Sequence, residues 1–381
     1  MYKSYEQYLL QQHSTDKYRS LPNVKLDLSI SYLDFSNNDY LGLSKNPEVI
    51  QSAIMAAKKF GVGATGSRLI SGNNNLIESL EAKIAIDKQT QSALIFNSGF
   101  QTNFSVLSSL LDPGILGEQA LVFFDKANHS SLYQAIFLSK AKLIRFQHNN
   151  MIHLSQLLNK FEKDHRPKFI ISETLFGMEG DLLPLTELIN LAEIHDAFLY
   201  LDEAHALGLF GSSGYGLSSN YDFKQVKYLL MGTFSKAIGC SGGYIACSQL
   251  IKNFLINKTP GFIYSTANSP MLIGAASKAW DLIRSLDIAR ENLKLLATNL
   301  RKQLKQLGFD TGLSNTHIIP IILKSEKLAL QLQKKLEQQY IRVSCIRPPT
   351  IPPGTSRLRI ALNSQHTQAD IDALISGLIN S

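Results

Sequence analysis

Two charged residues in the middle of the chain stand where apolar, strand-like runs end. Lys236 lies in "GTFSKAIGCSGG", between the apolar runs at 226–231 and 243–247, and Asp202 ends the run at 197–202. A lysine that reaches solvent from a tight turn is an equally good explanation of the first segment taken alone. If these runs are strands of one sheet, however, the amine and the carboxylate can face one pocket from two sides.

An amine and a carboxylate facing one pocket suit the chemistry of pyridoxal phosphate. This cofactor needs a lysine for a Schiff base, a carboxylate that keeps its pyridine nitrogen protonated, and amides for its phosphate. Desolvation would make Lys236 a usable nucleophile and base. His129 could then stack on the ring, and His205 could bond the phenolic oxygen. Taken singly, each histidine would more often be a satisfied core residue.

Other polar residues also follow predicted strands. "NSGFQ" places Gly99 and Phe100 at the start of a helix, where free N–H groups and the helix dipole favour an anion. An ordinary strand-to-helix turn is the commoner meaning of that motif. His129 and Glu173 likewise follow apolar runs. Because ligands bind at the carboxyl ends of parallel strands, these residues are predicted to share one edge of a sheet.

Strand-like and helix-like segments alternate between about residues 75 and 250. The predicted strands are 92–96, 120–124, 142–146, 168–172, 197–202, 226–231 and 243–247. Apolar strands alternating with helices predict an α/β fold with a mostly parallel, seven-stranded sheet covered by helices. A helical stretch at about 268–307 and the elements after it predict a smaller C-terminal α+β domain. We expect an N-terminal segment at 1–44, a large domain at 45–275 and a small domain at 276–381.

Composition excludes several classes of protein. The 381 residues are 44% hydrophobic, enough for a large core in two or more lobes. Three cysteines without metal-type spacing argue against a disulfide framework and against a metal site. No apolar run is long enough to span a membrane, and the polar N-terminus predicts a soluble, cytoplasmic protein. A net charge of +7 without a Lys/Arg block indicates phosphate-bearing ligands or an acidic carrier protein rather than nucleic acid.

Motifs spread over nearly the whole chain resemble those of the α-oxoamine synthases, a family of fold-type I pyridoxal phosphate enzymes. They are "NNDYLGLS", "GATGSRLISG", "NSGFQTN", "HSSL", "GMEGDLLPLTEL", "LDEAHALGLFG", "TFSKAIGCSGG", "IYST" and "IRPPTIPPGTSRLRIAL". The last motif is similar to the branch that acts in biotin synthesis. The resemblance implies a decarboxylative condensation of L-alanine with a pimeloyl thioester of CoA or of an acyl carrier protein. Carbon dioxide and the thiol would be released.

The family's catalytic roles fall on four residues of this chain. By resemblance, Lys236 is the Schiff-base lysine, Asp202 the partner of the pyridine nitrogen, His205 the residue on the phenolic oxygen, and His129 the stacking histidine. The binding roles fall on other residues of the motifs: the phosphate on Gly99, Phe100, Thr233, Ser235 and Thr266, and the substrates on Arg359, Asn38, Arg19 and Arg347. Thr266 is expected to reach the phosphate of the partner subunit in a homodimer with shared sites. Arg359 suits a carboxylate because its guanidinium offers a planar, bidentate fork.

Two departures from the family pattern and several alternatives stay open. Gly177 stands where the family usually has serine, and the segment before Asn37 is short. Other α-oxoamine synthases fit most of the same motifs: glycine C-acetyltransferases, enzymes like serine palmitoyltransferase, and synthases of signalling ketones. A DEAH-type NTPase is a remote alternative suggested by "LDEAH" and "GVGATGSR". The second motif has Ser67 and Arg68 where a Walker A motif has lysine followed by Ser or Thr.

Overall fold

The computed structural model describes residues 1–21, 32–223 and 225–380, which form two compact units. The large unit comprises Asn38–Gly177 and Leu182–Arg290, and the small unit comprises Met1–Asn37, Met178–Asp181 and Glu291–Ser381. Contacts therefore divide the chain after Asn37 and Arg290, whereas the boundaries expected from the sequence lie after residues 44 and 275. Residues 22–31 of the expected N-terminal segment lie outside the described part.

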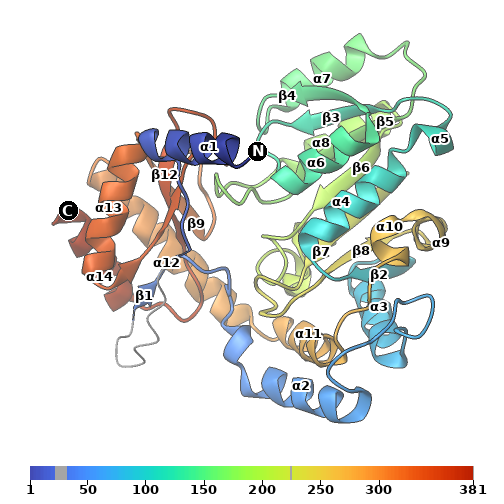
Figure 1. Cartoon of the computed structure of the whole chain (residues 1–381), viewed down its shortest axis with the longest axis horizontal. Coiled ribbons are helices and arrows are strands. Elements are labelled where there is room, and N and C mark those ends of the chain that lie inside the picture. Colours follow the sequence, from blue (N-terminus) through green and yellow to red (C-terminus); the bar gives the residue numbers. More distant parts are fainter. Residues whose placement is uncertain (22–31, 224, 381) are drawn as a thin grey trace. The chain divides into compact units, whose positions relative to one another are not determined.

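A seven-stranded sheet forms the centre of the large unit (Figure 1), as predicted. Its strands, in spatial order, are β2 (Ser92–Phe96), β8 (Gly243–Cys247), β7 (Tyr228–Thr233), β6 (Phe198–Asp202), β5 (Lys168–Glu173), β3 (Leu121–Asp125) and β4 (Lys142–Phe146). From β7 to β4 all neighbours are parallel, whereas β8 runs antiparallel to both β2 and β7. The mostly parallel sheet and the α/β fold class are confirmed.

Helices cover this sheet because each buries an apolar stripe on it. In the large unit they are α2 (Pro47–Phe60), α3 (Asn75–Asp87), α4 (Gly99–Leu110), α5 (Pro113–Leu116), α6 (Ser130–Ser139), α7 (Met151–Lys160), α8 (Leu185–Ile194), α9 (Gln249–Lys258), α10 (Pro260–Ile263) and α11 (Pro270–Ile283). Val106 of α4 and Leu132 of α6 lie in one core with Phe124, Tyr200 and Met231 of the sheet. Helices α4 and α6 pack side by side (Figure 1), so their N-termini are fixed relative to the strands.

The small unit is an α+β structure, as predicted. Its three-stranded antiparallel sheet has the order β11 (Ser344–Ile346), β12 (Ser356–Ala361), β9 (Ile318–Lys324), and β1 (Leu33–Asp34) pairs with β10 (Ile341–Arg342). Its helices are α1 (Tyr2–Ser14), α12 (Asp287–Gln306), α13 (Glu326–Gln338) and α14 (Gln368–Ile379). The predicted helical stretch at 268–307 is therefore two helices, α11 and α12. Within the described ranges, no helix combines the length and the apolar character needed to cross a membrane.

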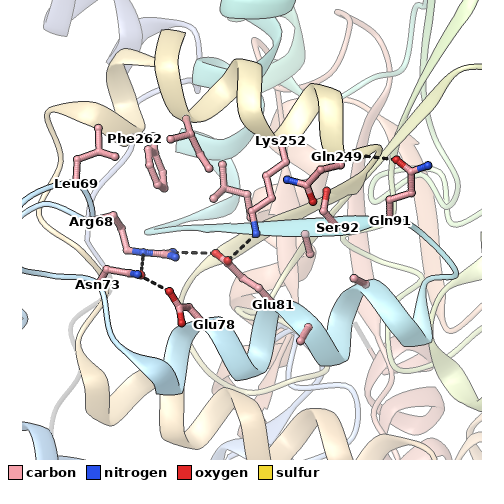
Figure 2. A pocket seen from close by; sticks show the side chains of 15 residues that line it. Arg68, Leu69, Asn73, Glu78, Glu81, Gln91, Ser92, Gln249, Lys252 and Phe262 are labelled. Carbon is pink, nitrogen blue, oxygen red and sulfur yellow. Dashed lines mark hydrogen bonds and ion pairs between the residues drawn. The ribbon is translucent and has the colours of Figure 1, made fainter.

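A charged cluster ties the edge strand β2 to the elements around it (Figure 2). Both carboxylate oxygens of Glu81 in α3 are used, because Arg68 Nη1 lies 2.8 Å from one and Lys252 Nζ of α9 lies 3.1 Å from the other. The first oxygen also accepts a 2.9 Å hydrogen bond from the backbone N–H of Ile95. A cavity of about 460 Å³ lies beside the cluster. The cluster thus satisfies an unpaired N–H of the edge strand and anchors the segment that carries Arg68.

Glu81→Gln is expected to lower the free energy of unfolding by about 3 kcal/mol, the cost of leaving a buried charge without its partner. The side chains of Arg68 and Glu81 are only 9% and 4% exposed, so water cannot replace the lost ion pair. Urea denaturation measures the change. Glu78→Gln on the exposed side of the same helix is the matched control. Equal stabilities of the two variants would contradict the role assigned to Glu81.

Candidate active site

Four strands of the large unit end in polar residues at one edge of the sheet. Asp125, Glu173, Asp202 and Thr233 are the last residues of β3, β5, β6 and β7, and all four are buried. These strands are parallel neighbours, and Glu173 lies directly opposite Asp202 in the register of β5 and β6. The predicted gathering of polar residues at one sheet edge is present in the structure.

The N-terminus of α4 lies at the same edge and offers an anion site. A Cβ atom built on Gly99 would lie 3.2 Å from Oγ1 of Thr233, so glycine lets this helix end approach the end of β7 closely. Thr233 Oγ1 lies 2.9 Å from Oγ of Ser235. Free N–H groups in the first turn, the helix dipole and two hydroxyls suit a phosphate. The side chain of Phe100 is exposed, so its contribution there would come from its backbone.

Lys236 lies on the turn between β7 and β8, at the place predicted for it. The turn is closed by backbone hydrogen bonds of 2.8 Å from Gly239 to Lys236 and from Cys240 to Phe234. Lys236 is half-buried, and its charge acts on both His129 and Glu173. Lys236, His129 and Glu173 therefore lie within electrostatic reach of one another.

Asp202 and His129 are each held by specific hydrogen bonds. The carboxylate of Asp202 accepts from Asn103 Nδ2 at 2.7 Å and from the backbone N–H of Ala204 at 2.8 Å. His129 is the N-cap of α6, and its Nδ1 accepts from the backbone N–H of Ser131. Burial lowers the pKa of His129, the Asp202 carboxylate raises it and the Lys236 ammonium lowers it, with burial the largest effect. His129 is therefore neutral at pH 7.

Glu173 is a site residue to which the sequence motifs assigned no role. Burial raises its pKa to about 8, reinforced by the charges of Asp202 and Asp125 and opposed by Lys236 and by the His129 N–H. That N–H donates to Glu173 Oε1 at 2.6 Å. Glu173 thus carries its proton at neutral pH and ties the end of β5 to the residue that caps α6. The available signal was its place at the end of a predicted strand, the same signal that marked Asp202.

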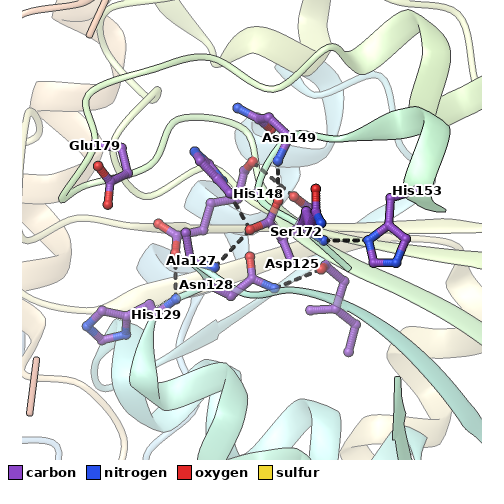
Figure 3. A network of polar contacts seen from close by, with 12 residues as sticks. Asp125, Ala127, Asn128, His129, His148, Asn149, His153, Ser172 and Glu179 are labelled. Atoms are coloured by element: carbon purple, nitrogen blue, oxygen red, sulfur yellow. Dashed lines mark hydrogen bonds and ion pairs between the residues drawn. The ribbon is translucent and has the colours of Figure 1, made fainter. Parts of the chain in front are cut away.

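A second carboxylate, Asp125, fixes the loop that leads to His129 (Figure 3). One oxygen accepts from the backbone N–H of Ala127 at 2.8 Å and lies 3.0 Å from Nδ1 of His148, while the other accepts from the backbone N–H of Asn149 at 2.8 Å. These bonds hold the loops after β3 and β4 together. The loop after β3 therefore delivers His129 to the sheet edge in a fixed position.

His205, Tyr40 and Asn38 form a chain of contacts in the large unit. The hydroxyl of Tyr40 lies 2.7 Å from Nδ1 of His205 and 3.0 Å from Oδ1 of Asn38. Gly177 lies against the other side of the imidazole, because a Cβ atom built there would be 2.2 Å from His205 Nε2. The glycine found where the family usually has serine is thus needed for the observed orientation of His205.

Gly177→Ala is expected to rotate the imidazole of His205 away from Tyr40 and to lower the free energy of unfolding by about 1–3 kcal/mol, the usual cost of overpacking. A crystal structure of the variant and urea denaturation measure the two effects. Gly63→Ala is the matched control, because the nearest atom to a Cβ there is 4.0 Å away. A variant that keeps His205 within 2.7 Å of Tyr40 at unchanged stability would contradict this account.

The chain was compared with protein families, curated proteins and solved structures. A model of aminotransferase class I and II matches residues 30–378. The chain belongs to this family. It is 44% identical over 349 residues to a putative 8-amino-7-oxononanoate synthase of Paramagnetospirillum magneticum, with 92% of this chain and 88% of that protein covered. It is 41% identical over 350 residues to the 8-amino-7-oxononanoate synthase of Gluconacetobacter diazotrophicus, with 91% and 87% covered.

Solved structures agree on the fold. An 8-amino-7-oxononanoate synthase of Francisella tularensis has a TM-score of 0.76 at 28% identity, covering 92% of this chain and 98% of that one. A high-resolution structure of SPT with its PLP internal aldimine has a TM-score of 0.84 at 27% identity, covering 91% and 86%. The fold class and the family predicted from the motifs are confirmed.

Thr266 lies beside the start of α4 in its own chain. Its carbonyl oxygen accepts a 2.8 Å hydrogen bond from Asn97 Nδ2, and its backbone bridges to Ser67. The side chain is exposed. The expected contact of Thr266 with a partner subunit's phosphate stays a prediction.

The three arginines predicted to bind substrate all lie in the small unit. Arg359 is buried in β12, paired with β11 on one side and β9 on the other. Arg347 donates to the carbonyl oxygens of Asp16 and Tyr18, and Arg19 Nη2 donates to Thr350 Oγ1 at 2.8 Å. The structure thus brings the segments of Arg19 and Arg347 together, while the substrate roles of all three arginines stay predictions.

Proposed function

We propose that the protein is a pyridoxal phosphate-dependent 8-amino-7-oxononanoate synthase. It would condense L-alanine with a pimeloyl thioester and release carbon dioxide and the thiol, a step of biotin biosynthesis. The observation that carries the proposal is the convergence of Lys236, Asp202 and His129 at one sheet edge, beside the N-terminus of α4. Relatives named for this activity are 39–44% identical over about nine-tenths of the chain, which supports the choice within the family.

The residues at the sheet edge fit the cofactor. The first-turn amides of α4, with Thr233 and Ser235, would hold its phosphate, and Gly99 leaves the space for that approach. Asp202 would hold the proton on the pyridine nitrogen, and the neutral imidazole of His129 would cover the ring face. His205, oriented by Tyr40, would bond the phenolic oxygen. When bound, pyridoxal phosphate supplies an electron sink for carbanion chemistry at the α-carbon of an amino acid.

Lys236 has two tasks in this proposal. Its amine would bind the cofactor's aldehyde before alanine enters. Once alanine displaces it, the same amine would take the α-proton from the substrate and return a proton at the end of the reaction. The half-buried turn on which it stands limits access of water to the amine.

The arginines and Asn38 would set the choice of substrates. Arg359 would bind a substrate carboxylate, for which a bidentate fork suits better than an ammonium. Arg19 and Arg347 would serve the far end of a pimeloyl chain, which carries a carboxylate or its ester. An arginine beside a long apolar acyl tail would be costly unless paired, so these residues disfavour a fatty acyl donor.

The proposal includes the assembly and the setting of the enzyme. We infer a homodimer with shared active sites, in which Thr266 reaches the phosphate bound by the partner subunit. The acyl donor would be pimeloyl-CoA or pimeloyl-acyl carrier protein, and the net charge of +7 suits the phosphates of either donor. Cys240, Cys247 and Cys345 are unpaired, which supports the reducing setting of the cytoplasm.

The test is a comparison of substrates on the purified protein loaded with pyridoxal phosphate. We expect 8-amino-7-oxononanoate to form from L-alanine and a pimeloyl thioester at least about tenfold faster than product forms from glycine, from serine or from a decanoyl donor, a difference of about 1.4 kcal/mol in the barrier. Mass spectrometry of the product decides the outcome. Faster turnover of decanoyl-CoA would place the enzyme among the synthases of signalling ketones, and faster turnover of glycine or serine would point to the other branches.

A further inference from the structure

A buried amide in α4 contacts both the carboxylate and the serine that supports the histidine of the site. Asn103 is 2% exposed, and its Nδ2 lies 2.7 Å from Oδ2 of Asp202 and 3.0 Å from Oγ of Ser131. Its Oδ1 accepts a 2.7 Å hydrogen bond from the hydroxyl of Tyr200, which is fully buried. Every polar atom of the Asn103 side chain is therefore used inside the protein.

The direction of each hydrogen bond in this network follows from its neighbours. A carboxylate can only accept, so the NH₂ group of Asn103 must face Asp202, and its carbonyl must face Tyr200. Burial and the charge of Asp202 raise the pKa of Tyr200 well above its ordinary value, so the hydroxyl keeps its proton and donates it. The second N–H of Asn103 points to Ser131, whose oxygen accepts it.

The network continues to His129 and selects one of its two neutral forms. Ser131 has its oxygen occupied as an acceptor, so its hydroxyl proton is available for Nδ1 of His129, 2.8 Å away. The backbone N–H of Ser131 also points at Nδ1, at 3.3 Å. An atom that accepts from two donors carries no proton. His129 is neutral, so its proton is on Nε2, and the imidazole presents an N–H at that position.

We propose that Asn103 is a positioning residue that couples Asp202 to His129, holding the carboxylate ionised in one orientation and the imidazole in its Nε2–H form. The inference rests on the proposed function, in which Asp202 and His129 contact the cofactor. Asn103 acts through them and touches no substrate. The proposal deepens the description of the site, because one amide sets the states of the two groups on either side of the ring.

The charges around this network leave the amide as its neutral link. Glu173 of β5 and Lys236 of the β7–β8 turn both interact with Asp202 or with His129, and Asp125 interacts with Glu173. A second ionisable group in place of Asn103 would therefore add a charge to a set that is already closely balanced. This property makes the amide testable by an isosteric change.

The first test removes the donors. Asn103→Leu keeps the approximate size, and the full-length protein should bind pyridoxal phosphate about tenfold more weakly, as expected for loss of a hydrogen bond to a charged group. Tyr200→Phe removes only the hydroxyl that orients Asn103 and should weaken binding about two- to fivefold in the same direction. Ser109→Ala, a buried change in the same helix, should leave the affinity unchanged. If Asn103→Leu does not fold, Tyr200→Phe alone decides this arm.

The second test uses Asn103→Asp and a readout that a merely structural residue would not change. Two carboxylates at hydrogen-bond distance share a proton, because the like charges raise the pKa of the pair. The absorption spectrum of the bound cofactor should therefore show one titration step more than in the unsubstituted protein. A pH titration that superimposes on that of the unsubstituted protein, with unchanged cofactor affinity in Tyr200→Phe, would overturn the proposal.

The third test reads the histidine directly. In ¹⁵N-labelled protein, with the signal assigned by its loss in His129→Gln, His129 should show a proton on Nε2 and none on Nδ1 at neutral pH. A proton on Nδ1 would overturn the assigned network. These readouts do not depend on turnover, so a protein that binds pyridoxal phosphate but does not condense alanine with a pimeloyl thioester would refute the proposed function and leave this inference standing or falling by its own tests.

Discussion

Lys236→Ala is expected to lower kcat for the alanine condensation by at least about 10⁴-fold, because one change removes both the amine that binds the cofactor and the base that moves the α-proton. The visible absorption band of the lysine-bound cofactor should disappear. Far-UV circular dichroism should not change, because the residue sits on a turn closed by backbone hydrogen bonds that do not involve its side chain. Single-turnover assays with purified protein measure the residual rate.

Lys227→Ala is the matched control for this prediction. Lys227 precedes the same strand, β7, at its far end, and its ion pair with Asp196 is largely exposed. The control should retain full activity, since exposed ion pairs contribute little to stability. Appreciable turnover by the Lys236→Ala protein would show that another group carries out the chemistry.

Asp202→Asn is expected to lower kcat by about 10²–10⁴-fold, the range seen when a group that controls proton position is lost. A neutral amide cannot hold a proton on the pyridine nitrogen. It would also turn either a carbonyl or an NH₂ group towards Asn103, whose NH₂ faces this site, so part of the hydrogen bonding would depend on a flipped amide. Some cofactor should still bind, because the phosphate contacts at α4 and Thr233 are untouched.

Rate and cofactor affinity measured on the same preparation separate these effects. Asp196→Asn, an exposed carboxylate in the loop before β6, is the control and should leave both unchanged. An Asp202→Asn enzyme with the normal rate would mean that a different residue holds the pyridine proton. The position of Asp202 would then be structural.

The strands of the large sheet were predictable because burial on both faces makes them continuously apolar. The predicted bounds of β2 and β8 agree with the structure, whereas β7 begins and ends two residues later than the run at 226–231. Its last residues, Gly232 and Thr233, are not apolar, and they belong to the strand because they pair with Tyr244 and Gly243 of β8. Pairing of that kind is tertiary information that a local run does not contain.

The site was predictable only in part for the same reason. Asp202 and Lys236 stand where strands end, and the order of strands and turns marks such positions. Asn103 and Ser131 are polar residues inside or at the start of amphipathic helices, where a polar side chain usually faces water. Their role depends on which face of α4 and α6 meets the sheet. The end of α11 also lacks a glycine or proline, so the break before α12 had no local signal.

The reversed direction of β8 limits how the protein can vary in length. Because β7 and β8 form a hairpin inside the sheet, flanked by β6 and β2, the segment with Lys236 is bounded on both sides by central strands. An inserted or deleted residue there would shift the register of a strand that is paired along both of its edges. The connections between helices and parallel strands elsewhere in the sheet can absorb such changes at the surface. Natural and engineered length variation should therefore be least tolerated between Thr233 and Gly243.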